Sequence, residues 1–344
     1  MKKRVLAAFL SMAMVAGLAT GCGTPGGGKS DGDSADGKVF RYAVNTLPTT
    51  LDPTKGQSIG DNEIQHAITE GLTRNTAGDV KPGIAESWDE SEDGLTYTFH
   101  LRKDAKWSDG EPITAADFEY SWKRLVNPET ASPYAFIGDC LKNGQAIEQG
   151  KMDVEELGVK AVDDTTLEVT LEHPTSYFLS LIGSSGQFAP LRQDIVEKYG
   201  TDFAATSEKN VYSGPFVMTS SEDNVWTFEK NDNYWDKDSI NLDKCELNYV
   251  ENTDTQLSMY EAGDLDYVQV PTAYVSDYKD KAEVFANGNV DFCYINSKSD
   301  NPVLGNKNFR LALNYALNRN DYNKLANADT YTAFNGLVFP GLQA

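Results

Sequence analysis

Histidine and cysteine are scarce in this sequence, whose 344 residues include three histidines and four cysteines. His66, His100 and His173 are far apart, and the cysteine spacings match no zinc or redox motif. The HExxH, G-x-S-x-G and P-loop signatures are also missing from the sequence. We therefore expect no zinc site, no common hydrolase site and no cofactor.

Positive charge is also in short supply, with 30 lysines and arginines against 52 acidic residues and a net charge of −22. A surface of this sign repels nucleic acid and anionic lipid headgroups, so neither is an expected partner. Carboxylate pairs arise by chance in such a sequence. A secreted hydrolase with paired carboxylates therefore stays an alternative, although no motif brings two of them together.

The sequence has one notable apolar run, residues 5–19, and it is shorter than the roughly 20 residues that cross a bilayer. It follows Lys2-Lys3-Arg4, which is typical of a secretory signal, and we assign residues 1–21 to a signal peptide. Residues 22–38 are rich in Gly, Ser and Asp and are expected to form a flexible tether.

Two motifs overlap around Cys22. Gly21 to Gly26 formally matches G-x-G-x-x-G, but Pro25 and further glycines follow instead of a helix, which argues against a dinucleotide site. Thr20-Gly21-Cys22 instead resembles the lipobox of bacterial lipoproteins, although Ala19 replaces the usual Leu or Val. The resemblance implies cleavage before Cys22 and acylation of its sulfur. Ordinary cleavage that leaves Cys22 unmodified is the alternative.

Short strands dominate the pattern from Phe40 onward, which is typical of an α/β protein. Residues 95–101 alternate strictly and put His100 on the polar face, as a surface or cross-strand residue. Residues 159–171 predict a hairpin that turns at Asp163-Asp164-Thr165. Further strands are predicted at 40–44, 216–218, 225–228 and 245–250.

Helices are predicted at 62–73, with a stop at Gly71, and at 256–263, with a terminal glycine. Another helix should begin at Thr114 and Asp117, whose spacing resembles a capping box. The cleanest apolar stripe runs from Phe309 to Leu317. Three tryptophans in apolar-periodic or turn positions are expected to be structural: Trp88, Trp107 and Trp122.

Three cysteines remain besides Cys22, namely Cys140, Cys245 and Cys293. At least one of them must be unpaired, and an exported chain could join two in a disulfide. Cys245 and Cys293 both lie in strand-like alternation, so buried thiols are expected there.

Several segments occur in the order found in one family. Residues 81–125 (KPGIAESWDESEDGLTYTFHLRKDAKWSDGEPITAADFEYSWKRL) resemble the extracellular solute-binding proteins of family 5, which serve ABC importers. The similarity continues through 127–135 (NPETASPYA), 157–178 (LGVKAVDDTTLEVTLEHPTSYF) and 308–319 (NFRLALNYALNR). It is greatest to the oligopeptide-binding branch and extends from residue 40 onward.

The resemblance implies an α/β, periplasmic-binding-protein-like fold (class II, cluster C) with two lobes that close on a ligand. Domain I would comprise residues 39–69 and 194–292, and domain II would be inserted as residues 70–193. Residues 293–344 would begin domain III, the second lobe. Because that domain is long in the family, the sequence resembles a truncated member whose fold is incomplete.

The implied function is a monomeric, membrane-anchored receptor that captures oligopeptides and delivers them to an ABC permease, without catalysis. It would act at the outer face of the cytoplasmic membrane. Dipeptides, nickel complexes, haem or oligosaccharide are alternative cargoes within the family. An adhesive surface lipoprotein is a further alternative, because the tether also fits that role.

The family binds peptide as an added β-strand, which implies roles for seven residues. Residues Gln57, Ser58 and Ile59 match its peptide-pairing segment, and Tyr134 matches a ligand-contacting tyrosine. Three further candidates lie before Pro271 or at the crossing into domain III: Gln269, Tyr294 and Asn296.

Some features leave other readings open. Residues 57–59 could form only a turn, and Tyr134 could simply pack against a loop. Gln57 replaces an acidic residue of the best-known members. The family's Trp-Cys-Ala-Asp-Tyr motif, whose aspartate pairs with the peptide's ammonium group, does not occur in these residues. Weak peptide binding by this chain alone is therefore expected.

Overall fold

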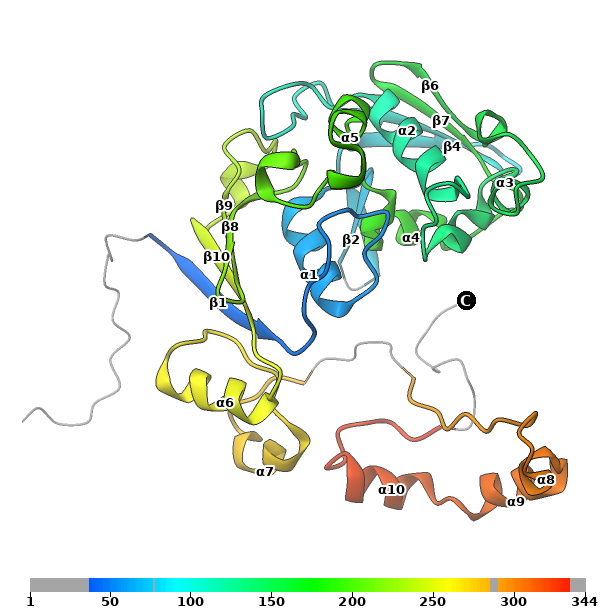
Figure 1. The fold of residues 1–344 in the computed structure, drawn as a ribbon, viewed down its shortest axis with the longest axis vertical. Coiled ribbons are helices and arrows are strands. Elements are labelled where there is room, and N and C mark those ends of the chain that lie inside the picture. The colour runs from blue at the N-terminus through cyan, green and yellow to red at the C-terminus, as the bar shows by residue number, and fades with distance from the viewer. Residues whose placement is uncertain (1–36, 77, 285–289, 335–344) are drawn as a thin grey trace, which may run out of the picture. The chain divides into compact units, whose positions relative to one another are not determined.

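The computed structural model describes residues 37–76, 78–284 and 290–334 (Figure 1). One sheet in this part of the chain has the strand order β1-β10-β9-β8. Strand β1 runs parallel to β10, with Phe40 opposite Cys245, and the other pairs are antiparallel. The members are β1 (Val39–Val44), β8 (Phe216–Glu222), β9 (Val225–Lys230) and β10 (Lys244–Tyr249). The sheet thus joins two segments that are far apart in the sequence.

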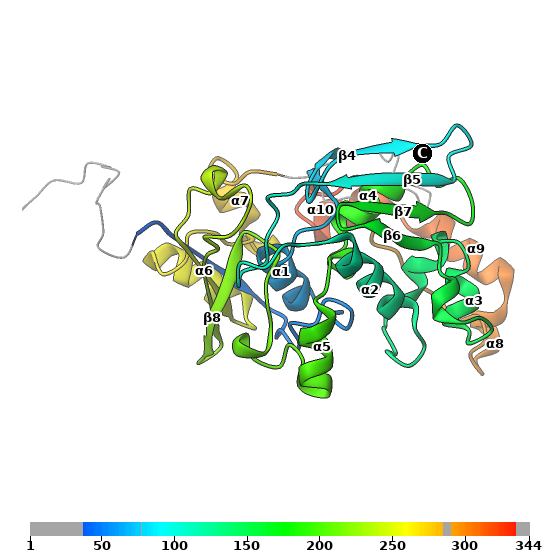
Figure 2. The same cartoon turned by 90° about the horizontal axis from the view of Figure 1, so that it is seen from above.

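The intervening chain forms a second, antiparallel sheet with the order β4-β5-β7-β6. Its strands are β4 (Ala85–Glu90), β5 (Thr96–Leu101), β6 (Val159–Asp163) and β7 (Thr166–Thr170). Helix α2 (Ala115–Val126) runs beside β6 and β7 (Figure 2). It buries Phe118 and Trp122 in a core shared with Phe99 and Phe178. The ribbon β2 (Thr73–Thr76) and β3 (Asp79–Pro82) lies between the sheets in chain order.

The remaining helices are short. They are α1 (Ile59–Ile68), α3 (Gly144–Glu148), α4 (Phe178–Ser184), α5 (Gln193–Tyr199), α6 (Thr253–Ala262), α7 (Val275–Tyr278), α8 (Pro302–Gly305), α9 (Lys307–Ala316) and α10 (Arg319–Ala326). Among the described residues, no helix combines the length and apolarity needed to cross a membrane.

Most local predictions are confirmed. The hairpin of β6 and β7 turns where expected, and Thr114 and Asp117 form a capping box at the start of α2. His100 is a cross-strand residue whose Nε2 lies 2.9 Å from Asp89 Oδ2. Trp107 and Trp122 are buried, and Trp88 packs against the same core. Helix α6 ends at Gly263, in the left-handed conformation.

Two predictions are wrong in detail. Helix α1 runs from Ile59 to Ile68 rather than from 62 to 73, because Ser58 caps it and Thr69 adopts an extended conformation. Cys293 is exposed and lies outside any strand, whereas Cys245 is buried as predicted. Burial raises the pKa of the Cys245 thiol to about 11, so this cysteine is an inert core residue. The predicted stripe forms α9, but none of its residues is buried.

The loop before α1 is organised by the Asp61 carboxylate, which is fully buried. Its Oδ1 accepts hydrogen bonds from the backbone N–H groups of Thr49 and Thr50, and its Oδ2 accepts those of Gln57 and Ser58. Burial by itself would raise the pKa of Asp61. The backbone donors outweigh that effect and hold the pKa below its usual range.

Asp61→Asn should destabilise the protein, since each carboxylate oxygen accepts two backbone N–H groups. In either orientation the amide NH2 would face two donors and leave them unsatisfied. We expect the free energy of unfolding at pH 7 to fall by about 3 kcal/mol, measured by urea unfolding.

The difference in unfolding free energy between wild type and Asp61→Asn should also depend on pH. Because the folded-state pKa of Asp61 is lowered, its contribution is complete above the unfolded value of about 3.9 and is lost as pH falls through the folded value. The gap between wild type and variant should therefore narrow in acid. Asp79→Asn is the control. Asp79 forms an exposed ion pair with Lys81, and such a pair contributes under about 1 kcal/mol to stability. A gap of the same size at acid and neutral pH would contradict the assignment.

Candidate ligand-binding site

The loop of residues 51–58 is fixed to elements on both sides. Arg124 of α2 makes two parallel hydrogen bonds to the Asp52 carboxylate, at 2.9 and 2.7 Å. Both side chains are largely buried. The Gln65 side chain donates to the Leu51 carbonyl at 2.9 Å. A bidentate Arg–carboxylate pair fixes orientation as well as distance, so α2 and the loop hold a single relative position.

The same loop is also bonded to the segment that contains Tyr134. Ser132 Oγ donates to the Thr54 carbonyl at 2.7 Å and accepts from the Tyr134 N–H at 3.2 Å. The structure therefore brings the segments around residues 57–59 and Tyr134 together, although about 75 positions separate them in the sequence.

The three predicted pairing residues differ in what they offer a ligand. The side chains of Gln57 and Ile59 are exposed, Ile59 at 60%. Ser58 Oγ is occupied, because it accepts the Asp61 N–H as the helix cap. In the described chain, the Gln57 carbonyl and the Ile59 N–H make no internal hydrogen bond. Both are main-chain groups that a ligand could use at this loop.

These two groups have the geometry of half a parallel bridge. Ser58 between them is extended, with φ −88° and ψ 161°. In an extended segment, the C=O of one residue and the N–H two positions later point to the same side. One ligand residue could donate its N–H to Gln57 and accept from Ile59, which is the parallel-strand pattern around Ser58.

Tyr134 is half-buried and has an aromatic neighbour that the sequence did not single out. The ring centroids of Tyr134 and Phe136 lie 5.7 Å apart, and Phe136 is 55% exposed. An exposed phenylalanine beside a half-buried tyrosine forms an apolar surface next to the loop. The only sequence signal was the position of Phe136 directly after the family-like segment 127–135.

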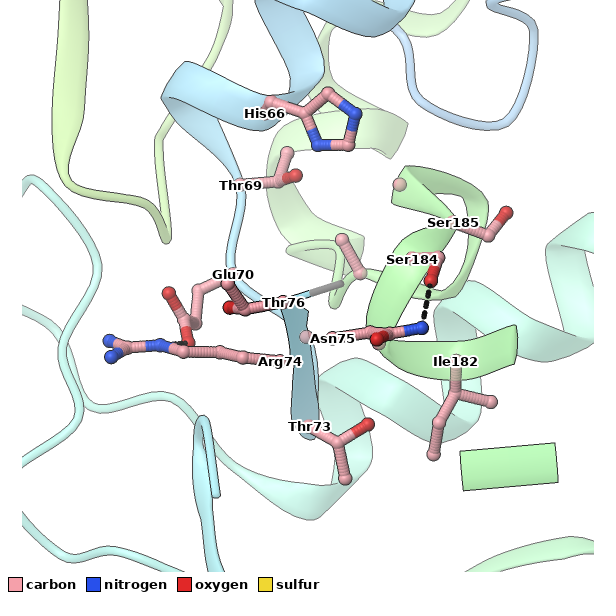
Figure 3. A pocket seen from close by; sticks show the side chains of 14 residues that line it. His66, Thr69, Glu70, Thr73, Arg74, Asn75, Thr76, Ile182, Ser184 and Ser185 are labelled. Atoms are coloured by element: carbon pink, nitrogen blue, oxygen red, sulfur yellow. Dashed lines mark hydrogen bonds and ion pairs between the residues drawn. The ribbon is translucent and has the colours of Figure 1, made fainter. Parts of the chain in front are cut away.

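A pocket of about 240 Å³ lies at the other end of α1 (Figure 3). We call it the α1–α4 pocket. It is lined by His66, Thr69, Glu70, Gly71, Thr73, Arg74, Asn75, Thr76, Ile182, Gly183, Ser184, Ser185, Gly186 and Ala189. No sequence pattern indicates this pocket, because its two walls come from segments more than 100 residues apart.

Glu70 is the buried charge of this pocket, at 7% exposure. It accepts from Arg74 Nε at 2.6 Å and from the Tyr234 hydroxyl at 2.5 Å. Burial and the neighbouring carboxylate raise the pKa of Tyr234, which keeps the phenol protonated as a donor. Arg74 also bonds Asp236 at 2.9 Å.

Three predicted site residues make no hydrogen-bonding contact with the loop of residues 57–59 or with Tyr134 in the described chain. Gln269, Tyr294 and Asn296 are exposed, and none shares a hydrogen bond with residues 57–59 or Tyr134 in the ranges described. Tyr294 is 84% exposed. Cys22 lies outside the described residues. No group of three or more His, Cys, Asp or Glu side chains in the described chain could hold a metal ion.

Comparison with known proteins places this geometry in a family. Residues 79–344 match the family described as bacterial extracellular solute-binding proteins, family 5, middle region. The dipeptide-binding protein DppE of Bacillus subtilis is 34% identical over 91% of this chain and 58% of its own length. The probable deoxycholate-binding periplasmic protein YgiS of Escherichia coli is 39% identical over 69% of this chain and 45% of its own length.

Comparison with a solved structure points to the same family. Listeria monocytogenes OppA bound to peptide aligns with a TM-score of 0.72 and 34% identity, over 83% of this chain and 58% of that protein. The chain thus spans a little over half the length of such relatives. The α/β, periplasmic-binding-protein-like fold expected from the sequence is confirmed. With the profile match and these similarities together, the chain belongs to the extracellular solute-binding proteins of family 5.

Proposed function

We propose that this protein is the peptide receptor of an ABC importer and that it binds its ligand by main-chain pairing at residues 57–59. The observation that carries the proposal is the free Gln57 carbonyl and Ile59 N–H on either side of an extended Ser58. Every peptide supplies the matching groups, so such a site binds without regard to sequence. Tyr134 and Phe136 supply an adjacent apolar contact.

The site has the properties of a binder rather than a catalyst. The buried carboxylates Asp52, Asp61 and Glu70 are each occupied by hydrogen-bond donors of the protein. None is left as a general acid or base. We therefore propose capture and release without chemistry, with delivery of the peptide to a permease.

The proposed division into domains is the one that the family implies. We propose that the sheet of β1, β8, β9 and β10 belongs to domain I (39–69 and 194–292) and the sheet of β4 to β7 to the inserted domain II (70–193). Domain III would begin at residue 293. Gln269, Tyr294 and Asn296 would complete the site as lobes close on the ligand, because the closed form makes more contacts. The receptor would act as a monomer.

Ile59→Pro tests the main-chain pairing directly. Ile59 is the first residue of α1, where proline is well tolerated, and the extended Ser58 suits a following proline. The change removes the one N–H assigned to the ligand and breaks no internal hydrogen bond. Calorimetric titration of the full-length gene product with an alanine-based peptide should show affinity about tenfold weaker.

Ile59→Val is the matched control, because it keeps both the N–H and a branched side chain. Thermal unfolding should be nearly unchanged in both variants. Equal peptide affinity for Ile59→Pro and wild type would reject pairing at this loop. Ligands that copurify with the wild type, identified by mass spectrometry, would separate peptide from bile-acid or other cargo.

We also propose that Cys22 is acylated and anchors the receptor at the outer face of the cytoplasmic membrane, with residues 23–38 as its tether. In a bacterial host, wild-type protein should incorporate labelled palmitate and sediment with membranes. Cys22→Ser should lose the label and appear in the soluble envelope fraction. An unlabelled wild type that fractionates like the variant would support ordinary cleavage instead.

A further inference from the structure

We propose that the α1–α4 pocket binds a positively charged ligand side chain, namely a lysine or arginine of the bound peptide. The inference rests on the peptide-receptor function proposed above and adds a selectivity to it. Its basis is the direction of the hydrogen bonds in the pocket wall, which leaves acceptors facing a ligand and few donors.

Three hydroxyl protons of the wall are committed to the protein. Thr69 Oγ1 donates to the Gln65 carbonyl at 2.7 Å, and Thr73 Oγ1 donates to the Leu179 carbonyl at 2.9 Å. Ser185 Oγ donates to Gln187 Oε1 at 2.5 Å. A hydroxyl has one proton and two lone pairs, so each of these oxygens can only accept from a ligand.

The hydroxyl of Ser184 and the side-chain amide of Asn75 also donate their protons to the protein. Ser184 Oγ donates to the Ser180 carbonyl at 2.8 Å. Asn75 Nδ2 donates to Ser184 Oγ at 2.8 Å (Figure 3) and also to the Ser180 carbonyl at 3.5 Å, so both contacts of this amide nitrogen lie within the protein. Five polar side chains of the pocket have thus placed their protons away from a ligand.

The charges nearby favour a cation as well. Glu70 and Asp236 are both paired to Arg74, which leaves the three groups with one net negative charge. The Arg74 guanidinium bonds Glu70, Asp236 and Tyr234 through its three nitrogens and stacks on Trp235 at 4.6 Å. An acidic ligand side chain would meet acceptors and a net negative charge, whereas an ammonium group would be paired by both.

The pocket is positioned to be reached from the pairing loop. Ile59 and His66 are seven positions apart on α1 and both are exposed, so they lie on one helix face about 10 Å apart. An extended peptide covers that distance in about three residues. Gln187 connects the two places, since it accepts from Ser185 and donates to the Gly56 carbonyl at 3.2 Å. At 240 Å³ the pocket far exceeds the roughly 10–15 Å³ of probe volume that one water needs.

The test is a positional scan of alanine pentapeptides against the full-length gene product at pH 8. Lysine is placed at each position in turn, with norleucine and glutamate at the same positions as controls. At one position lysine should bind about tenfold more tightly than norleucine, and glutamate more weakly than either.

Ser184→Lys would place a competing ammonium group in the pocket, at an exposed side chain that tolerates the change. It should abolish the preference for lysine over norleucine peptides. Ser176→Lys, also exposed but outside the pocket, changes the net charge equally and should keep the preference.

The outcomes separate the two proposals. If lysine and norleucine peptides bind equally, or if Ser184→Lys leaves a lysine preference intact, the pocket assignment is overturned while the receptor function stands. If no peptide binds, the receptor function fails and the pocket assignment fails with it.

Discussion

The burial of one charge, the Asp61 carboxylate, constrains the whole candidate site. An isolated buried carboxylate costs several kcal/mol, and here four backbone N–H groups compensate for that cost. They can do so only if residues 49–58 wrap around the start of α1 in one conformation. The wrapping uses the N–H groups of Gln57 and Ser58 and leaves the Gln57 carbonyl and the Ile59 N–H without a hydrogen bond in the described chain. One charge thus orders the loop and determines which groups a ligand can meet.

The buried ion pair of Arg124 and Asp52 extends this order to the rest of the site. Arg124 belongs to α2, which packs on the sheet of β4 to β7, whereas Asp52 belongs to the loop that follows β1. Losing one partner of such a pair typically costs about 3–5 kcal/mol, because the other charge stays buried. The pair therefore fixes the loop against the segment that carries Tyr134. The site depends on contacts between distant segments, which agrees with its position beside both sheets.

The sequence predicts those strands, turns and helix starts whose signals come from residues close together in the chain. Strict alternation identified β5, the Asp163-Asp164-Thr165 turn identified the hairpin of β6 and β7, and the Thr114–Asp117 spacing identified the start of α2. It failed for the start of α1, because the cap at Ser58 precedes the apolar stripe that defined the prediction. It failed for Cys293, where alternation has no partner strand. The sequence has no signal for the α1–α4 pocket, because its walls come from distant segments and the hydroxyl of Thr73 on one wall donates to the Leu179 carbonyl of α4 on the other.

Breadth and selectivity can coexist in this site because they use different atoms on the same helix. In the proposed site, pairing at Ser58 would engage main-chain groups that all peptides share, while the pocket near His66 would engage one side chain. Since α1 is rigid, the distance between the two is fixed, and the paired residue determines which ligand side chain reaches the pocket. Selectivity then depends on the spacing between the paired position and a basic residue rather than on overall peptide charge. A net charge of −22 attracts basic peptides from a distance, but only this fixed spacing can distinguish among them.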